Sequence, residues 1–159
     1  MSQRILGRKA LTAMMLAAFV APGVAADESP SPNPATIDVA VASQPVEPGA
    51  TAQLTVRVVP AAGIKINRYP KIQVTVPEVD GLVGASAASL GNPKPPPVDN
   101  PESNYFKEPE PVQLELHVSA DAPSGAQEIG AEIKYFYCVA ASGYCAPARS
   151  QFKIPVSVK

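Results

Sequence analysis

The sequence has no tryptophan, a single histidine and only two cysteines, and these shortages limit the chemistry open to it. The histidine is His117, and all three methionines, Met1, Met14 and Met15, lie near the start of the chain. A blue-copper centre needs two histidines beside its cysteine, and a structural zinc site needs four ligands. The glycine patterns that bind phosphates or dinucleotides are also missing. We therefore expect no metal and no cofactor.

A cysteine–histidine nucleophile is also poorly supported. His117 alternates with apolar neighbours in a way that places it on the water-facing side of its strand, and no third group that could orient it is identifiable. We do not expect hydrolytic chemistry.

The sequence also lacks an excess of basic residues. It holds 13 Lys and Arg against 14 Asp and Glu, and three of the basic residues lie within residues 1–26. Without those residues, 13 minus 3 leaves 10 basic against 14 acidic side chains, a net charge of about −4. Nucleic acids and anionic lipid surfaces select clustered Lys and Arg. We expect neither as a partner.

Residues 1–26 have the pattern of a secretory signal peptide. A basic start precedes an apolar run that ends at Pro22, and small residues precede Asp27. The run of about twelve residues is well short of the roughly twenty that cross a bilayer. We predict cleavage after Ala26, a periplasmic location and no stable membrane insertion afterwards. Disulfides can form and turn over in that compartment.

The rest of the chain is typical of an all-β protein. No segment has the helical period, and short alternating runs are separated by proline and glycine turns. We expect strands at about 37–41, 53–59, 64–69, 71–76, 112–118, 128–137 and 151–158, with a possible edge strand within 80–90. Residues 27–35 lack apolar side chains and predict a flexible lead-in. Residues 36–159 then form one antiparallel β-sandwich domain of the immunoglobulin-like class.

The two cysteines, Cys138 and Cys145, lie either side of a turn that ends in Gly143. An aromatic run precedes the first cysteine, and Pro147 is expected to limit ladder bonding just after the second. We expect the pair to face each other near the tip of a hairpin. A bridge closing so short a loop contributes only about 2.5 kcal/mol, against about 4.7 for a hundred-residue loop.

We interpret the pair as a thiol–disulfide exchange site, because a bridge at this position is a weak staple. A purely structural hairpin bridge is the alternative, since single cysteine pairs in exported domains are commonly structural.

Residues 92–111 form a long proline-rich segment with Tyr105 and Phe106 near its middle. A loop of this length inside a compact domain is usually functional or disordered. The two aromatic side chains either anchor the loop on the core or cover the cysteine pair as a lid. A ligand for SH3-type domains is a weaker interpretation, because such domains are not expected in the periplasm.

Three segments resemble the periplasmic N-terminal domain of the thiol:disulfide interchange protein DsbD family, an immunoglobulin-like sandwich, with a likeness that spans about residues 36–158. They are Gly63-Ile-Lys-Ile-Asn-Arg-Tyr69, Asn104-Tyr-Phe-Lys107, and the stretch from Tyr135-Phe-Tyr-Cys138 to Gly143-Tyr-Cys145-Ala-Pro147. The resemblance implies that Cys138 and Cys145 are a redox pair. The pair would receive electrons from a membrane thiol reductant and pass them to periplasmic thioredoxin-like proteins.

The resemblance also implies further site residues. Phe106 or Tyr105 would occupy the place of the family's cap loop. Lys65 and Asn67 stand where the family tends to carry aromatic residues, and Tyr137 and Tyr144, which precede the two cysteines, are expected as further neighbours.

The chain carries no membrane or thioredoxin-like segment after the cysteine pair, so we expect the electron donor to be a separate protein. The competing hypothesis is a non-catalytic immunoglobulin-like binding or accessory domain whose bridge only pins a hairpin.

Overall fold

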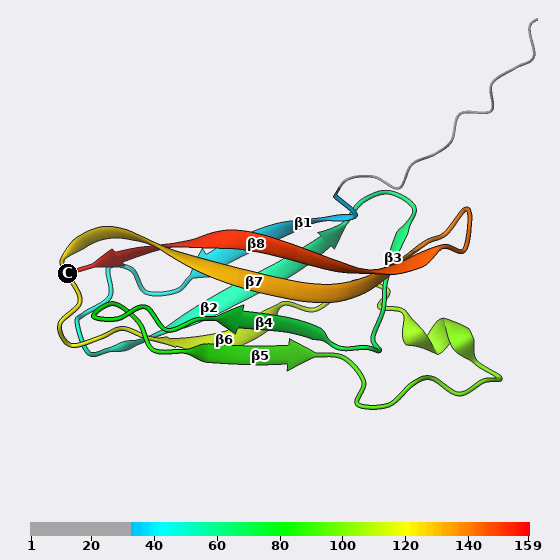
Figure 1. Ribbon diagram of the computed structural model, residues 1–159, viewed down its shortest axis with the longest axis horizontal. Helices are drawn as coiled ribbons and strands as arrows, with labels where there is room; N and C mark the ends of the chain where they lie inside the picture. The colour runs from blue at the N-terminus through cyan, green and yellow to red at the C-terminus, as the bar shows by residue number, and fades with distance from the viewer. Residues whose placement is uncertain (1–32) are drawn as a thin grey trace, which may run out of the picture.

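The computed structural model describes residues 33–159, which fold into two antiparallel β-sheets (Figure 1). Within these residues the only helical segment is the short 3-10 helix η1, Pro101–Asn104, and no helix has the length and apolar character needed to cross a bilayer. The predicted all-β class is confirmed. The predicted signal peptide and residues 27–32 of the predicted lead-in lie outside the described residues.

The smaller sheet has three strands in the order β1-β2-β6. These strands are β1 (Ala35–Val41), β2 (Thr51–Pro60) and β6 (Val112–His117). Their apolar residues alternate as expected: Leu54 and Val56 of β2 are fully buried, whereas His117 faces water. This sheet supplies one wall of the core.

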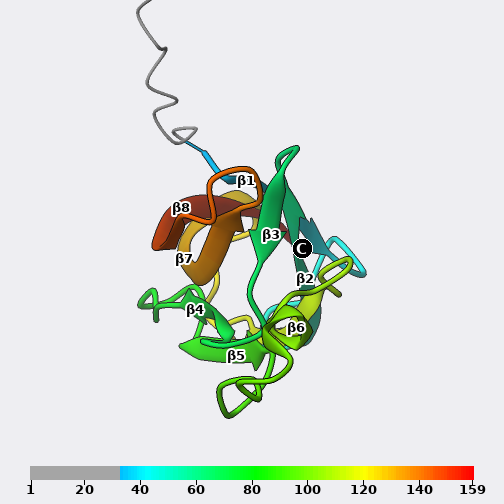
Figure 2. The same ribbon diagram turned by 90° about the vertical axis from the view of Figure 1, so that its right-hand side faces the viewer.

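The larger sheet has five strands and is built around β7 (Gly125–Val139). One side of β7 pairs with β8 (Cys145–Val158) over its whole length. The other side pairs first with β4 (Ile72–Val76) and then, nearer the β7–β8 turn, with β3 (Ile64–Ile66). The predicted edge strand is β5 (Ser86–Leu90), which pairs with β4. Figure 2 looks along the length of the molecule and shows both sheets surrounding a common core.

Along β7 the side chains alternate strictly between the core and the outside. Ile133, Tyr135 and Tyr137 are buried between the sheets, and each such side chain stabilises the fold by about 1.5–3 kcal/mol through apolar burial. The even-numbered residues therefore point to the outer face of the sheet. Cys138 belongs to this outer set.

Strand β8 is longer than the sequence indicated, because it starts at Cys145 and runs through both Pro147 and Pro155. The two prolines are tolerated because β8 pairs with β7 on one side only, and the backbone N–H and C=O positions of its odd-numbered residues point away from β7. The side chain of Gln44 shows this direction by binding the carbonyl oxygen of Pro155 at 3.2 Å and the N–H of Ser157 at 2.7 Å. Pro147 therefore interrupts no ladder bond.

The long proline-rich segment starts where Gly91 is pressed against the backbone of Arg68. Gly91 has a φ of +127°, and a Cβ added there would lie 2.2 Å from the carbonyl oxygen of Arg68. That oxygen also accepts a hydrogen bond from the N–H of Asn92 at 2.7 Å. Glycine at this position thus holds the start of the segment beside the β3–β4 connection.

We predict that Gly91→Ala lowers the free energy of unfolding by about 2–3 kcal/mol, because the backbone must move away from Arg68 and keep a positive φ. Gly81→Ala is the matched control: its φ is +67°, with no atom within 4 Å of an added Cβ. Its cost should be about 1 kcal/mol. Urea denaturation of both variants checks the difference, and equal losses would contradict the close approach at Gly91.

Candidate functional site

The two cysteines are the residue pair of β7 and β8 that lies nearest the turn, and a disulfide bond joins them. Cys138 and Cys145 are direct cross-strand partners, and their Cα atoms are 4.0 Å apart. The turn that follows is closed by hydrogen bonds from the N–H of Val139 to Tyr144 and from the N–H of Gly143 to Val139, each 2.8 Å. The expected pairing at a hairpin tip is confirmed. The tip lies at the end of the molecule opposite the C-terminus (Figure 1).

The two sulfur-bearing residues differ in their access to solvent. Cys138 is only 3 % exposed, whereas Cys145 is exposed. In thiol–disulfide exchange an incoming thiolate attacks one sulfur and the other sulfur leaves as a thiolate. Of the two cysteines, Cys145 is thus the one open to an incoming thiolate, and in such an attack Cys138 would be the leaving group.

Residues 101–106, which we call the cap segment, bring Tyr105 into contact with Cys138. Tyr105 in this segment forms an isolated antiparallel bridge with Asn67, just beyond β3. Asn104 fixes the position of the bridge, because its side-chain amide accepts a hydrogen bond from the Tyr69 N–H at 2.9 Å and donates one to the Tyr69 carbonyl oxygen at 3.0 Å. The cap segment thus continues the sheet edge next to the disulfide.

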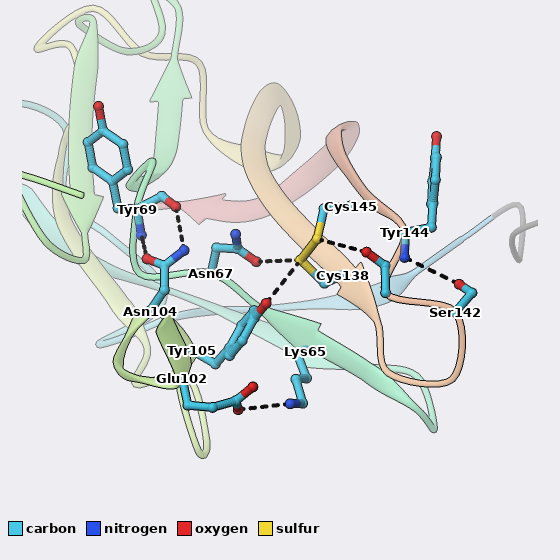
Figure 3. The surroundings of a disulfide bond; sticks show 11 residues. Lys65, Asn67, Tyr69, Glu102, Asn104, Tyr105, Cys138, Ser142, Tyr144 and Cys145 are labelled. Carbon is cyan, nitrogen blue, oxygen red and sulfur yellow. Dashed lines mark hydrogen bonds and ion pairs between the residues drawn. A yellow bond between two sulfur atoms is a disulfide. The ribbon is translucent and has the colours of Figure 1, made fainter. Parts of the chain in front are cut away.

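The two aromatic residues of the cap segment have different positions. Tyr105 lies on the outer face, where its hydroxyl donates a hydrogen bond to Cys138 Sγ at 3.5 Å (Figure 3). Phe106 is 8 % exposed and belongs to the core, with the Arg68 guanidinium 4.6 Å from its ring centroid. Phe106 therefore anchors the segment, and Tyr105 contacts the sulfur.

Asn67 lies on the other side of the same sulfur. Asn67 is the one buried polar residue within residues 33–159, at 7 % exposure, and its Oδ1 lies 3.5 Å from Cys138 Sγ. A disulfide sulfur carries no hydrogen, so this approach is a contact in the oxidised protein. It can become an S–H···O hydrogen bond once Cys138 is a thiol.

Lys65 places a positive charge beside the disulfide. It is the cross-strand neighbour of Cys138, and its ammonium group forms a 2.9 Å ion pair with Glu102 and lies 4.8 Å from the Tyr105 ring centroid. The Lys65 and Glu102 side chains are 40 % and 72 % exposed. Exposed ion pairs and exposed cation–π contacts each stabilise by about 1 kcal/mol or less. These contacts hold the cap segment only weakly.

Among the other expected neighbours, Tyr137 and Tyr144 do not contact the disulfide. Tyr137 is buried on the core face of β7, the opposite side from Cys138. Tyr144 is 51 % exposed in the turn, and its ring points away from the sulfurs (Figure 3).

Two residues of the site carry no expected role from the sequence: Glu102, which pairs with Lys65, and Asn104, which clamps Tyr69. Their partners lie 37 and 35 positions away, so no local pattern links them.

Nowhere in residues 33–159 do three His, Cys, Asp or Glu side chains gather in a way that could hold a metal ion. No protein-family model, curated protein or solved structure matches the chain.

We predict that Phe106→Ala lowers the free energy of unfolding by about 3 kcal/mol, as for other buried phenylalanines. Tyr105→Ala should cost about 1 kcal/mol, because its ring lies on the outer face and its contacts are weak. Chemical denaturation of both variants with the disulfide intact gives the comparison. Equal losses would show that Tyr105 is also part of the anchor.

Proposed function

We propose that the protein is a periplasmic thiol–disulfide exchange domain whose Cys138–Cys145 pair relays electrons from a membrane thiol reductant to thioredoxin-like partners. Its sheets would form an immunoglobulin-like sandwich of the DsbD N-terminal type. The observation that carries this proposal is the unequal exposure of the two cysteines, with Cys138 lying beneath a Tyr105 side chain that only weak, partly exposed contacts hold in place.

The arrangement of the resembling segments supports the proposal. The segment that contains β3, Tyr105 of the cap segment and the hairpin tip are far apart in sequence, yet all three meet at the disulfide (Figure 3). A resemblance confined to separate strands of the core would carry no such link to function.

In the proposed reduction of the domain, the partner is the membrane thiol reductant: one of its thiolates attacks Cys145 Sγ and forms a mixed disulfide with it. The Cys138–Cys145 bond breaks, and its electron pair leaves on Cys138 Sγ. A second thiolate of the partner then attacks the partner's own sulfur, which releases Cys145. The partner leaves with a disulfide, the domain keeps two thiols after taking up protons from water, and two electrons have been transferred.

The surroundings of Cys138 favour it as the leaving sulfur. The Tyr105 hydroxyl already donates to this sulfur, and a hydrogen bond of this kind strengthens when the acceptor becomes charged. After protonation, the thiol can donate to Asn67 Oδ1. Both forms of the reduced, largely buried sulfur therefore have a hydrogen-bond partner close by.

We predict that the disulfide opens reversibly while the protein remains folded, at a reduction potential above about −300 mV, the level below which structural bridges usually lie. Graded dithiol buffers, alkylation of free thiols and mass spectrometry give the potential, and circular dichroism of the same samples reports the fold. A bridge that opens only as the fold melts would instead support the structural bridge of an accessory domain.

We predict that two substitutions at Tyr105 change the reduction of the disulfide in different ways. Tyr105→Phe keeps the ring but loses the hydrogen bond to the leaving sulfur, which is worth about 1.5 kcal/mol when fully charged, so reduction should slow by about three- to tenfold. Tyr105→Ala uncovers Cys138 and should allow attack at both sulfurs.

A monothiol followed by alkylation and fragment mass spectrometry identifies the sulfur that carries the adduct. The wild type and Tyr105→Phe should carry it on Cys145 alone. Adducts on both cysteines in the wild type would contradict the shielding of Cys138.

A further inference from the structure

The outer face of the β7–β8 hairpin continues away from the disulfide in a regular ladder. The next outward pair is Phe136 opposite Pro147, and the pair after it is Lys134 opposite Arg149. Successive residues of a strand advance by about 3.3 Å, so the Lys134–Arg149 pair lies about 13 Å along the strands from the sulfurs. The apolar Phe136–Pro147 pair thus lies between the disulfide and the basic Lys134–Arg149 pair.

This part of the face is hollowed. A cavity of about 360 Å³ lies between the hairpin and the start of β4. Its lining includes apolar Pro70, Phe136 and Pro147 and cationic Lys71, Lys134 and Arg149. The volume falls at the lower end of the range of ligand sites, which is about 300–1,000 Å³.

The hollow is positively charged although the whole chain has a formal net charge of −1. Glu132 is shared by Lys134 at 3.1 Å and Arg149 at 3.4 Å, whereas Lys71 has no ion pair within the described part of the chain. Three cations therefore face one carboxylate. An added anion would meet cations that the fold leaves only partly neutralised.

The free edge of β8 next to the disulfide is unsuited to receiving another strand. Pro147 has no N–H to offer there, and an added strand needs unbroken donors along that edge. A segment that brings a thiol to Cys145 would therefore lie across the outer face, over Phe136 and the hollow.

We propose that the hollow binds an acidic side chain of the polypeptide segment that delivers the attacking cysteine to Cys145. The acidic residue would be an Asp or Glu about four positions from that cysteine, because four extended residues span about 13 Å. The intervening residues would pack on Phe136 and Pro147. This inference rests on the proposed exchange function and specifies the chemistry of its partner.

The test uses blocked pentapeptide thiols, Cys-Thr-Ser-Thr-Xaa and the reverse order, in which Xaa is Glu, Gln or Lys. Their charge lies far from the thiol, so their intrinsic reactivities are nearly equal. The protein is used in its oxidised form. In at least one of the two residue orders, the Glu peptide should open the disulfide up to tenfold faster than the corresponding Lys peptide, and the Gln peptide should react at an intermediate rate. The difference should shrink as salt rises. A Glu placed next to the cysteine should give a smaller advantage.

Two variants locate the effect. Lys71→Gln should reduce the ratio of the Glu to the Lys peptide rate by at least half, whereas Lys153→Gln should leave it unchanged. Lys153 lies on the same face but pairs with Glu128 and does not line the hollow.

A wild-type ratio near one, or a ratio that Lys71→Gln does not change, would overturn this inference and leave the exchange function standing. Failure of every peptide to open the disulfide in the folded protein would instead reject the exchange function itself.

Discussion

The site depends on the two-residue period of a single strand. β7 lies in the middle of the larger sheet, and its register with β3, β4 and β8 sends its odd-numbered side chains into the core. The same register sends Cys138 outward, to a position next to Lys65 and opposite Cys145. A slip of one residue would move Tyr137 outside and bury the sulfur among the core side chains. The burial of the aromatic core therefore fixes the placement of the disulfide.

The cap segment combines one strong attachment with several weak ones. Phe106 is inserted in the core and Asn104 binds the Tyr69 backbone on both of its polar groups, so the base of the segment is fixed. By contrast, Tyr105 is held on the sulfur by one hydrogen bond and by an exposed lysine. Local opening is easiest where contacts are few and exposed. A rotation of the Tyr105 side chain would therefore uncover Cys138 and leave the core unchanged.

Much of this fold follows from the sequence because its signals are local. Leu54, Val56 and the apolar residues of β4 and β6 alternate cleanly, and the cysteines pair across a turn that they themselves flank. The same alternation also places Tyr137 on the face opposite Cys138, because adjacent residues of a strand point to opposite faces. The sequence alone could therefore have excluded Tyr137 as a neighbour of the disulfide.

The remaining features were not predictable because they join distant segments. The bridge between Asn67 and Tyr105 and the ion pair between Lys65 and Glu102 depend on how the proline-rich segment returns to the sheet edge, and no period in the sequence encodes that path. The start of β8 at Cys145 was not predicted for another reason. Proline disfavours a strand in general, and only the position of Pro147 on an edge, with its nitrogen turned away from β7, makes it harmless. A bridge also adds little to this hairpin as a staple, since 14 residue pairs already fix the register of β7 and β8. Its loop-closure contribution of about 2.5 kcal/mol is small beside the apolar burial along the same strands. A covered cysteine bonded to an exposed one, with hydrogen-bond partners close to the covered sulfur, is consistent with the proposed exchange reaction.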